Sequence, residues 1–306
     1  MKFKTLAIAI AAATVSTAAM ADGHMSAPEL KISGDVTVGY FDTNNTNPTS
    51  NTTSFGGNGS EVIFNAEQKV GNITYFGSVT ANIGDDVRGD GNWSTDDQYI
   101  GFKGAFGEVR MGDTDNGCDV VDTGWVVPDE IITSETSGCG VTNVAGVGVA
   151  GDQNNLTYRG SRGPISYAVS YSPDVDFGAS VPGEDTYAFG AAGKVGPATV
   201  SLGYVTAGDD RNNTVLGVSG NFGPVAVGAR ASKVEDGDTI YDLTASYAAR
   251  GNTVYAAYSD ADNNAEQVFL GYQRSLGSNT TFILEYVNTD ASAVDDQYAI
   301  ALKHAF

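Results

Sequence analysis

The feature that most constrains the fold is a two-residue alternation of apolar and polar side chains in short segments separated by breaks. In the last segment, Tyr298, Ile300 and Leu302 share one parity while polar or small residues occupy the other. Such alternation is typical of a strand with one apolar and one polar face. Short breaks fall near residues 71–72, 105–107, 163–164, 196–197, 223–224, 250–252 and 277–279, and longer polar breaks near 42–59, 84–95, 174–185, 208–213, 234–238, 260–265 and 290–296. The pattern predicts strands joined alternately by tight turns and by loops.

The predicted strands number 16, each of about 8 to 11 residues, close to the length that crosses a bilayer at a tilt. They begin near Leu30, Glu61, Ile73, Gln98, Glu108, Asn154, Ile165, Thr186, Ala198, Thr214, Val225, Thr239, Thr253, Glu266, Thr280 and Gln297. A soluble sandwich would more often use Greek-key crossovers and would not need loops of one-sided length. We therefore predict an all-β fold, a 16-stranded antiparallel transmembrane β-barrel with short turns at one end and longer loops at the other.

The N-terminal region predicts export from the cytoplasm. Residues 1–21 combine two lysines, an apolar run and a small-residue ending at Ala21, which are typical of a secretory signal. The remaining chain, residues 22–306, then carries 14 basic against 37 acidic residues, a formal net charge of −23. This excess of acid argues against binding nucleic acid through a basic surface and favours contact with cations.

One long stretch lacks the strand alternation. Residues 112–152 contain both cysteines of the chain, Cys118 and Cys139, and no Lys or Arg. Because structureless loops of this length are uncommon in a compact domain unless they are functional, we expect a functional segment. Two cysteines within one loop of an exported protein predict a disulfide.

Several features together resemble the Gram-negative trimeric general diffusion porins, especially the alphaproteobacterial type. These features are the signal, the 16 strands, the terminal strand ending on Phe306, and the run KGAFGEVRMG (residues 103–112) that leads into the long stretch. The resemblance implies that this stretch, about residues 112–153, is the third external loop and folds into the barrel as its constriction. It also implies export through the periplasm, a place in the outer membrane of a Gram-negative bacterium among lipid and lipopolysaccharide, and a homotrimer.

The candidate site consists of acidic loop residues facing basic wall residues across the neck. The acidic candidates are Asp113, Asp115, Asp119 and Asp122, followed by Asp129, Glu130 and Glu135. On the wall, strand parity directs Arg110, Arg159 and Arg230 into the lumen, where they either face the loop or pair locally with wall acids such as Glu67 and Glu285. Because rings of Asp and Glu are the usual source of cation preference, we expect a water-filled, cation-preferring channel for ions and small hydrophilic solutes.

Other functions find less support in the residues. An enzyme is not expected, because the only histidines, His24 and His304, cannot build a catalytic arrangement within a lumen. No cofactor is required, although clustered loop carboxylates could bind Ca²⁺. Two alternatives to a general channel stay open: a substrate-selective porin, in which Trp125 of the long loop would contact the solute, and a structural or adhesive surface barrel.

Overall fold

The computed structural model describes residues 26–45, 52–57, 59–83, 93–121, 123–128, 131–132, 139, 153–175, 184–207, 212–235, 239–261, 264–290 and 294–306. The predicted signal segment lies outside these residues. The first strands are β1 (Glu29–Asn45), β2 (Thr52–Gly57), β3 (Ser60–Val70), β4 (Ile73–Ile83), β5 (Trp93–Gly104), β6 (Gly107–Thr114), β7 (Gln153–Arg162) and β8 (Ile165–Val175). They continue with β9 (Glu184–Val195), β10 (Ala198–Ala207), β11 (Asn212–Phe222), β12 (Val225–Val234), β13 (Thr239–Ala249), β14 (Asn252–Ala261), β15 (Asn264–Ser275), β16 (Thr280–Thr289) and β17 (Val294–Ala305).

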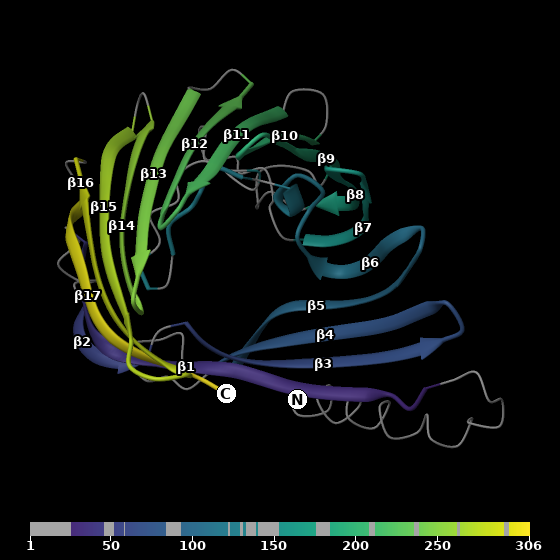
Figure 1. Ribbon diagram of the computed structural model, residues 1–306, viewed down its shortest axis with the longest axis horizontal. Helices are drawn as coiled ribbons and strands as arrows, with labels where there is room; N and C mark the ends of the chain where they lie inside the picture. Colours follow the sequence, from purple (N-terminus) through teal and green to yellow (C-terminus); the bar gives the residue numbers. More distant parts are fainter. Residues whose placement is uncertain are drawn as a thin grey trace.

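The strands form one closed antiparallel barrel. Each strand from β3 to β17 pairs with the next, and β17 pairs with β1 over Asp35–Asn45. On the other edge of β1, β3 and β2 lie end to end, pairing with Glu29–Asp35 and Val38–Thr43 respectively. These two segments therefore act as one interrupted strand, and the described chain closes as a barrel of 16 strands (Figure 1). The predicted fold class and strand number are confirmed.

The terminal residue completes the closure. The Phe306 N–H donates to the Gly34 carbonyl at 2.9 Å, and the Gly34 N–H donates back to the Phe306 carbonyl at 3.2 Å. A barrel closed in this way leaves fewer unpaired edge groups, which matters in a bilayer because lipid offers them no hydrogen-bond partner.

The two ends of the barrel differ as predicted. At the turn end, strands are joined by two or a few residues, and Gly71, Gly163, Gly196 and Gly223 adopt positive φ angles of 60° to 65°. Glycine accepts this left-handed conformation without the steric cost of a Cβ. The other end, here called the loop end, carries the longer connections, and the long segment between β6 and β7 starts there.

The strands extend further into the polar breaks than the sequence analysis predicts. The largest difference is five residues, at β5, which is predicted from Gln98 and begins at Trp93. In the break predicted over residues 42–59, β1 continues to Asn45 and Thr52–Gly57 forms β2. Polar side chains do not end a strand as long as its backbone groups find partners, so the hydrophobic alternation ends before the hydrogen-bonded ladder does.

Within the described part of the chain, no helix is long and apolar enough to cross a membrane. A short helical turn, η2 (Asp119–Val121), lies in the long segment between β6 and β7.

Candidate functional site

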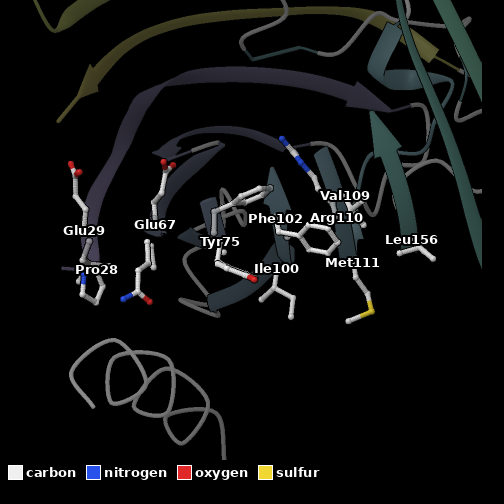
Figure 2. A pocket seen from close by; sticks show the side chains of 16 residues that line it. Pro28, Glu29, Glu67, Tyr75, Ile100, Phe102, Val109, Arg110, Met111 and Leu156 are labelled. Carbon is white, nitrogen blue, oxygen red and sulfur yellow. The ribbon is translucent and has the colours of Figure 1, made fainter. Parts of the chain in front are cut away.

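Alternation along each strand separates an outer from an inner face. On β10, Leu202 and Tyr204 are exposed, whereas the residues that alternate with them, Ser201, Gly203 and Val205, are buried. On β5 to β7, Ile100, Met111 and Leu156 point away from the side that carries Glu67 and Arg110 (Figure 2). The apolar set forms the outer face of the barrel, and the polar and small set forms the inner face.

The segment after β6 runs along this inner face. Near its start, the Thr157 hydroxyl on β7 donates to the Asp115 carbonyl at 3.2 Å, and the Gly117 N–H donates to the Ser170 hydroxyl on β8 at 2.8 Å. Further along, Thr244 Oγ1 on β13 donates to the Gly124 carbonyl at 2.7 Å. Described residues 115–132 therefore follow the inner wall past β8 to β13, and we call this segment the constriction loop.

Four inner-wall glycines make room for the loop. A Cβ added to Gly190, Gly203, Gly217 or Gly228, on β9 to β12, would meet a loop atom at 1.8 to 2.1 Å. The atoms met are Val121 Cγ2, Cys118 Sγ, the Thr123 carbonyl oxygen and the Gly124 carbonyl oxygen respectively. The loop thus lies directly on the wall backbone, in a groove that only glycine leaves open.

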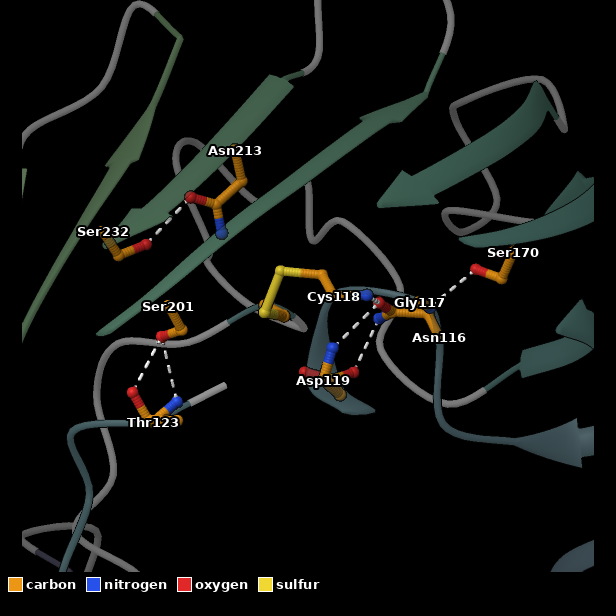
Figure 3. The surroundings of a disulfide bond; sticks show 10 residues. Asn116, Gly117, Cys118, Asp119, Thr123, Ser170, Ser201, Asn213 and Ser232 are labelled. Carbon is orange, nitrogen blue, oxygen red and sulfur yellow. Dashed lines mark hydrogen bonds between the residues drawn. A yellow bond between two sulfur atoms is a disulfide. The ribbon is translucent and has the colours of Figure 1, made fainter. Parts of the chain in front are cut away.

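The predicted disulfide is present and is part of this contact. Cys118 and Cys139 are bonded, with their Cα atoms 5.4 Å apart, and both are buried. They pack with Ala188, Val205 and Val215 of the inner wall. Figure 3 shows the disulfide close to the loop residues that bond to Ser170 and Ser201. The bridge therefore joins two parts of the loop and holds both against the wall.

Asn116 shapes the turn that precedes the disulfide. Its Oδ1 accepts the Cys118 N–H at 2.7 Å and the Asp119 N–H at 3.3 Å, and its Nδ2 donates to Asp119 Oδ2 at 2.6 Å. An Asn that bonds to backbone amides two and three residues ahead is a typical helix N-cap, and here it starts η2. Asp119 is thereby engaged within the loop itself.

The far end of the described loop is held by apolar packing and one buried carboxylate. Val127 and Ile132 pack with Phe41, Tyr255 and Phe269 in an apolar cluster on the inner wall of β1 and β14 to β17. Beside this cluster, Glu285 is fully buried, and its Oε2 accepts the N–H groups of Ile131 at 3.1 Å and Ile132 at 2.9 Å. Its Oε1 accepts the Tyr255 hydroxyl at 2.8 Å. We call Glu285 the loop anchor, because it bonds to the loop and the wall at once.

The wall that the described loop leaves uncovered carries charged and aromatic residues. Arg110 on β6 pairs with Glu108 at 2.5 Å, and its guanidinium lies 4.6 Å from the centre of the Tyr99 ring. Arg159 on β7 reaches across to the loop, where its Nη2 lies 2.9 Å from Asp115 Oδ2. A cavity of about 750 Å³ separates this wall from the loop on the turn side, lined by Lys69, Lys103, Glu108 and Arg159 on one side and by Val120 and Val121 on the other.

Arg230 lies elsewhere, beneath the loop. It is 3% exposed, and its guanidinium donates to Asp242 Oδ2 from Nη2 at 2.7 Å and from Nε at 3.1 Å. The Trp125 ring of the loop lies over it at 5.6 Å. Because a buried charge needs a hydrogen-bonded partner, the wall supplies Asp242. The inward orientation predicted for Arg230 is correct, but the loop separates its charge from the open lumen.

Comparisons with known proteins place this geometry in a family. The sequence matches the family described as Gram-negative porin over residues 7–294. The protein belongs to the Gram-negative porin family. A comparison with curated proteins gives no significant match. The porin is therefore an outer-membrane channel for passive diffusion, as its family and its barrel indicate.

Solved structures of porins share the fold of this chain. OmpTΔL8 of Vibrio cholerae, a loop L8 deletion mutant of OmpT, has a TM-score of 0.70 at 14% identity, covering 92% of this chain and 100% of that one. OmpF of Salmonella typhi in complex with daunomycin has a TM-score of 0.69 at 15% identity, covering 90% and 97%. An anion-selective porin from Comamonas acidovorans has a TM-score of 0.66 at 18% identity, covering 91% and 100%. Identities this low show a common fold only.

The structure brings some of the predicted acids to the neck of the porin and not others. Asp115 is there, paired with Arg159, and Asp119 lies in the loop, bonded to Asn116. Asp113 instead pairs with Asn154 at the position two residues beyond Met111, on the outer face, which corrects the expectation that it lines the neck. β6 continues to Thr114, so strand alternation still governs residue 113. Asp122, Asp129, Glu130 and Glu135 lie outside the described residues.

Sequence reasoning missed several residues that shape the site. Asp97 shares the inner face of β5 with Tyr99, within electrostatic range of Asp115 and Arg110. The same strand parity could have found it, had the strand not been started at Gln98. Asp242 pairs with Arg230, and Glu285 was considered as a partner for an arginine rather than for loop amides. Among the described residues, no group of three or more His, Cys, Asp or Glu is arranged to hold a metal ion.

Proposed function

We propose that the porin is a general diffusion channel that prefers cations. The observation that carries this proposal is that each predicted wall arginine is paired with a carboxylate: Arg110 with Glu108, Arg159 with Asp115 and Arg230 with Asp242. A paired arginine adds little net positive potential to the neck. The remaining acid, such as Asp97, then sets the sign of the potential, and an acidic aqueous neck concentrates cations.

Side chains rather than the barrel must determine the selectivity. The porin from Comamonas acidovorans shares this fold and is described as anion-selective. The present chain has 37 acidic and 16 basic residues, a formal net charge of −21 before removal of any signal. This balance supports a preference for cations in a lumen of the same shape.

Reversal potentials in a KCl gradient test the proposal. The wild-type channel is expected to pass K⁺ in preference to Cl⁻. Asp97→Asn is expected to lower the permeability ratio by about twofold. A unit charge a few ångströms away changes the energy of a monovalent ion by roughly 1 kcal/mol in water, before screening by salt. Asp113→Asn is the matched control, because it removes the same charge at the same end of an adjacent strand but on the outer face. A wild-type channel that prefers Cl⁻ would overturn the proposal.

The position of Trp125 does not support a role in binding a specific solute. Its ring packs against the apolar cluster on the wall and over Arg230. A residue in this position stabilises the loop rather than offering a binding surface. We therefore propose that ions and small hydrophilic solutes pass according to size and charge.

The assembly proposed for the porin is a homotrimer. Gly34 pairs with Val62, and Gly77 pairs with Ala66 and Ile100, all on the outer face of the first strands. Small residues on this face would allow close approach of a second subunit, and the exposed apolar residues beside them, such as Ile32 and Ile100, would be covered. Light scattering of the detergent-solubilised porin measures the subunit number directly.

Channel function is proposed to require no cofactor. Ca²⁺ bound by loop carboxylates is the one ion proposed, as a weak ligand. Conductance is measured first with the chelator EDTA and then after addition of CaCl₂. A reversible change in current would reveal such binding.

A further inference from the structure

Charged residues are distributed unequally between the two ends of the barrel. At the turn end, within four residues of a turn or of the strand end there, the described basic residues are Lys31, Lys69, Lys103, Arg110, Arg159, Arg162, Lys194, Arg250, Arg274 and Lys303. The acidic ones are Glu29, Glu67 and Glu108, and Asp35 lies beside Lys303 at 3.5 Å. At the loop end, the described acidic residues include Asp42, Asp96, Asp97, Asp113, Asp185, Glu235, Asp260, Glu266, Asp290 and Asp296, and the basic one is Lys233. The charge therefore changes sign along the axis of the barrel.

Two lysines make the turn end of the lumen positive. Lys69 pairs in register with Thr74, and Lys194 with Thr199, on the inner faces of their strands, and both side chains are exposed. Neither forms an ion pair within the described part of the chain. Lys103, by contrast, is neutralised by Glu67 at 3.0 Å. Lys69 and Lys103 line the cavity of about 750 Å³ on the turn side of the loop, so the positive region begins directly beyond the neck.

At the loop end, strand parity places most of these acids, such as Asp185, Asp260 and Asp296, on the outer face, and Asp97 on the inner face. Asp97 on β5 lies near Asp115 of the constriction loop, and Arg110 is already paired with Glu108. The neck lies between the two regions, because the constriction loop narrows the lumen there along the inner wall. The channel thus consists of an acidic outer segment and a basic inner segment in series.

We propose that this arrangement makes the porin rectify ionic current. The acidic segment is filled mainly by cations and the basic segment mainly by anions, each over a Debye length of about 10 Å at ~0.1 M salt. When the loop end is positive, cations from the acidic segment and anions from the basic segment both move toward the neck, so carriers accumulate there and conductance rises. When the polarity is reversed, both move away from the neck, carriers are depleted and conductance falls.

The inference deepens the proposed function and rests on its open channel, but it does not depend on a net preference for cations. The two ends of the channel therefore attract different ions. The loop end attracts cations, and the turn end attracts anionic solutes that enter from that side.

Current–voltage curves in symmetric 0.1 M KCl test the inference with the complete porin in a planar bilayer. The ratio of currents at +100 and −100 mV, with the loop end taken as the positive side, is expected to be at least about 1.5, falling toward one in 1 M KCl, where the Debye length is about 3 Å. Orientation is assigned by biotin attached to Ser278→Cys in the turn after β15, with streptavidin added to one compartment.

A matched pair of double variants locates the charges responsible. Lys69→Gln with Lys194→Gln is expected to bring the current ratio close to one. Arg162→Gln with Arg274→Gln removes two positive charges from the same end but from the outer face, where Arg162 pairs with Ile165 and Arg274 with Phe282, and is expected to leave the ratio unchanged. The thermal stability of both variants is measured first, to establish that each one folds. We expect intact barrels, because all four replaced residues are exposed.

The possible results separate the inference from the proposed function. A linear wild-type curve at 0.1 M KCl, or a ratio that the lysine pair does not change, overturns the inference even if reversal potentials show a preference for K⁺. A rectifying channel that prefers Cl⁻ overturns the proposed preference and supports the inference.

Discussion

Replacing the loop anchor, Glu285→Ala, should release the far end of the constriction loop while leaving the barrel folded. Glu285 is fully buried and, among the described residues, accepts hydrogen bonds from the Ile131 and Ile132 amides and from the Tyr255 hydroxyl. Removing the acceptor takes these bonds away, and a buried donor that loses its partner costs about 1 to 3 kcal/mol. Removing the carboxylate also relieves the cost of burying a charge, which offsets part of this loss.

We therefore expect a net loss of about 3 kcal/mol in the free energy that holds the loop end to the wall. Because 1.4 kcal/mol corresponds to a factor of ten, hydrogen exchange at the Ile131 and Ile132 amides should accelerate by roughly 150-fold. The exchange is measured residue by residue in detergent micelles. Single-channel recordings of the same variant should show added current noise, since the loop end would move in and out of the lumen.

Tyr255→Phe is the matched control, because it removes one of the three hydrogen bonds and keeps the ring that packs against Phe269. Its effect on the two amides should be about tenfold or less. Wild-type exchange at Ile131 and Ile132 in Glu285→Ala would refute the reasoning. The apolar cluster that contains Val127 and Ile132 would then be sufficient to hold the loop.

Two further predictions concern the contact between the loop and the wall. Replacing both cysteines, Cys118→Ser with Cys139→Ser, should lower the stability of the folded loop by about 3 kcal/mol, since the bridge closes a segment with a sequence separation of 21. Proteolysis within the loop should therefore be faster than in the wild type, and equal cleavage rates would contradict this. Gly217→Ala should displace the loop from the wall and lower single-channel conductance, because its Cβ would lie 1.8 Å from the Thr123 carbonyl oxygen, whereas Gly193→Ala, whose nearest neighbour is 3.6 Å away, should conduct as the wild type does.

Local periodicity was sufficient to predict the barrel. The two-residue alternation marks each strand, and the breaks mark each end, so strand number and pairing order follow without knowledge of distant contacts. The inward orientation of Arg110 and Arg159 followed from the same alternation. The disulfide followed from the number and placement of two cysteines.

The site itself depends on which distant residues meet, and alternation does not specify this. Nothing local shows that Glu285 accepts amides from residues more than 150 positions away. The error at Asp113 has a different cause. Its stretch of sequence is rich in acidic residues and was therefore predicted to be loop. The alternation that places Arg110 on the inner face continues through Asp113 and places it on the outer face. Strand parity should be followed until the hydrogen-bonded ladder ends.

The types of residue on the inner faces nevertheless indicate where the loop lies. β10 and β11 carry no charged residue, and their inner faces present Ser201, Gly203, Val215 and Gly217, all small or medium in size. Long charged or aromatic side chains would leave no groove for a backbone there. The inner faces of β4 to β7 instead carry Phe76, Tyr99 and the paired arginines, which need water or open space around them.

A barrel of this size encloses an aqueous lumen, so each part of its inner wall must be either solvated or covered. Small uncharged inner residues mark wall that is covered, and long charged ones mark wall that is solvated, except where, as at Arg230 and Glu285, the charge has a partner beneath the loop. In this porin the boundary between the two falls at β7 and β8, where Arg159 holds Asp115 and Ser170 accepts the Gly117 amide. The neck of the channel therefore lies between the constriction loop and β4 to β7, and the charges on those four strands, together with those of the loop, should dominate its selectivity.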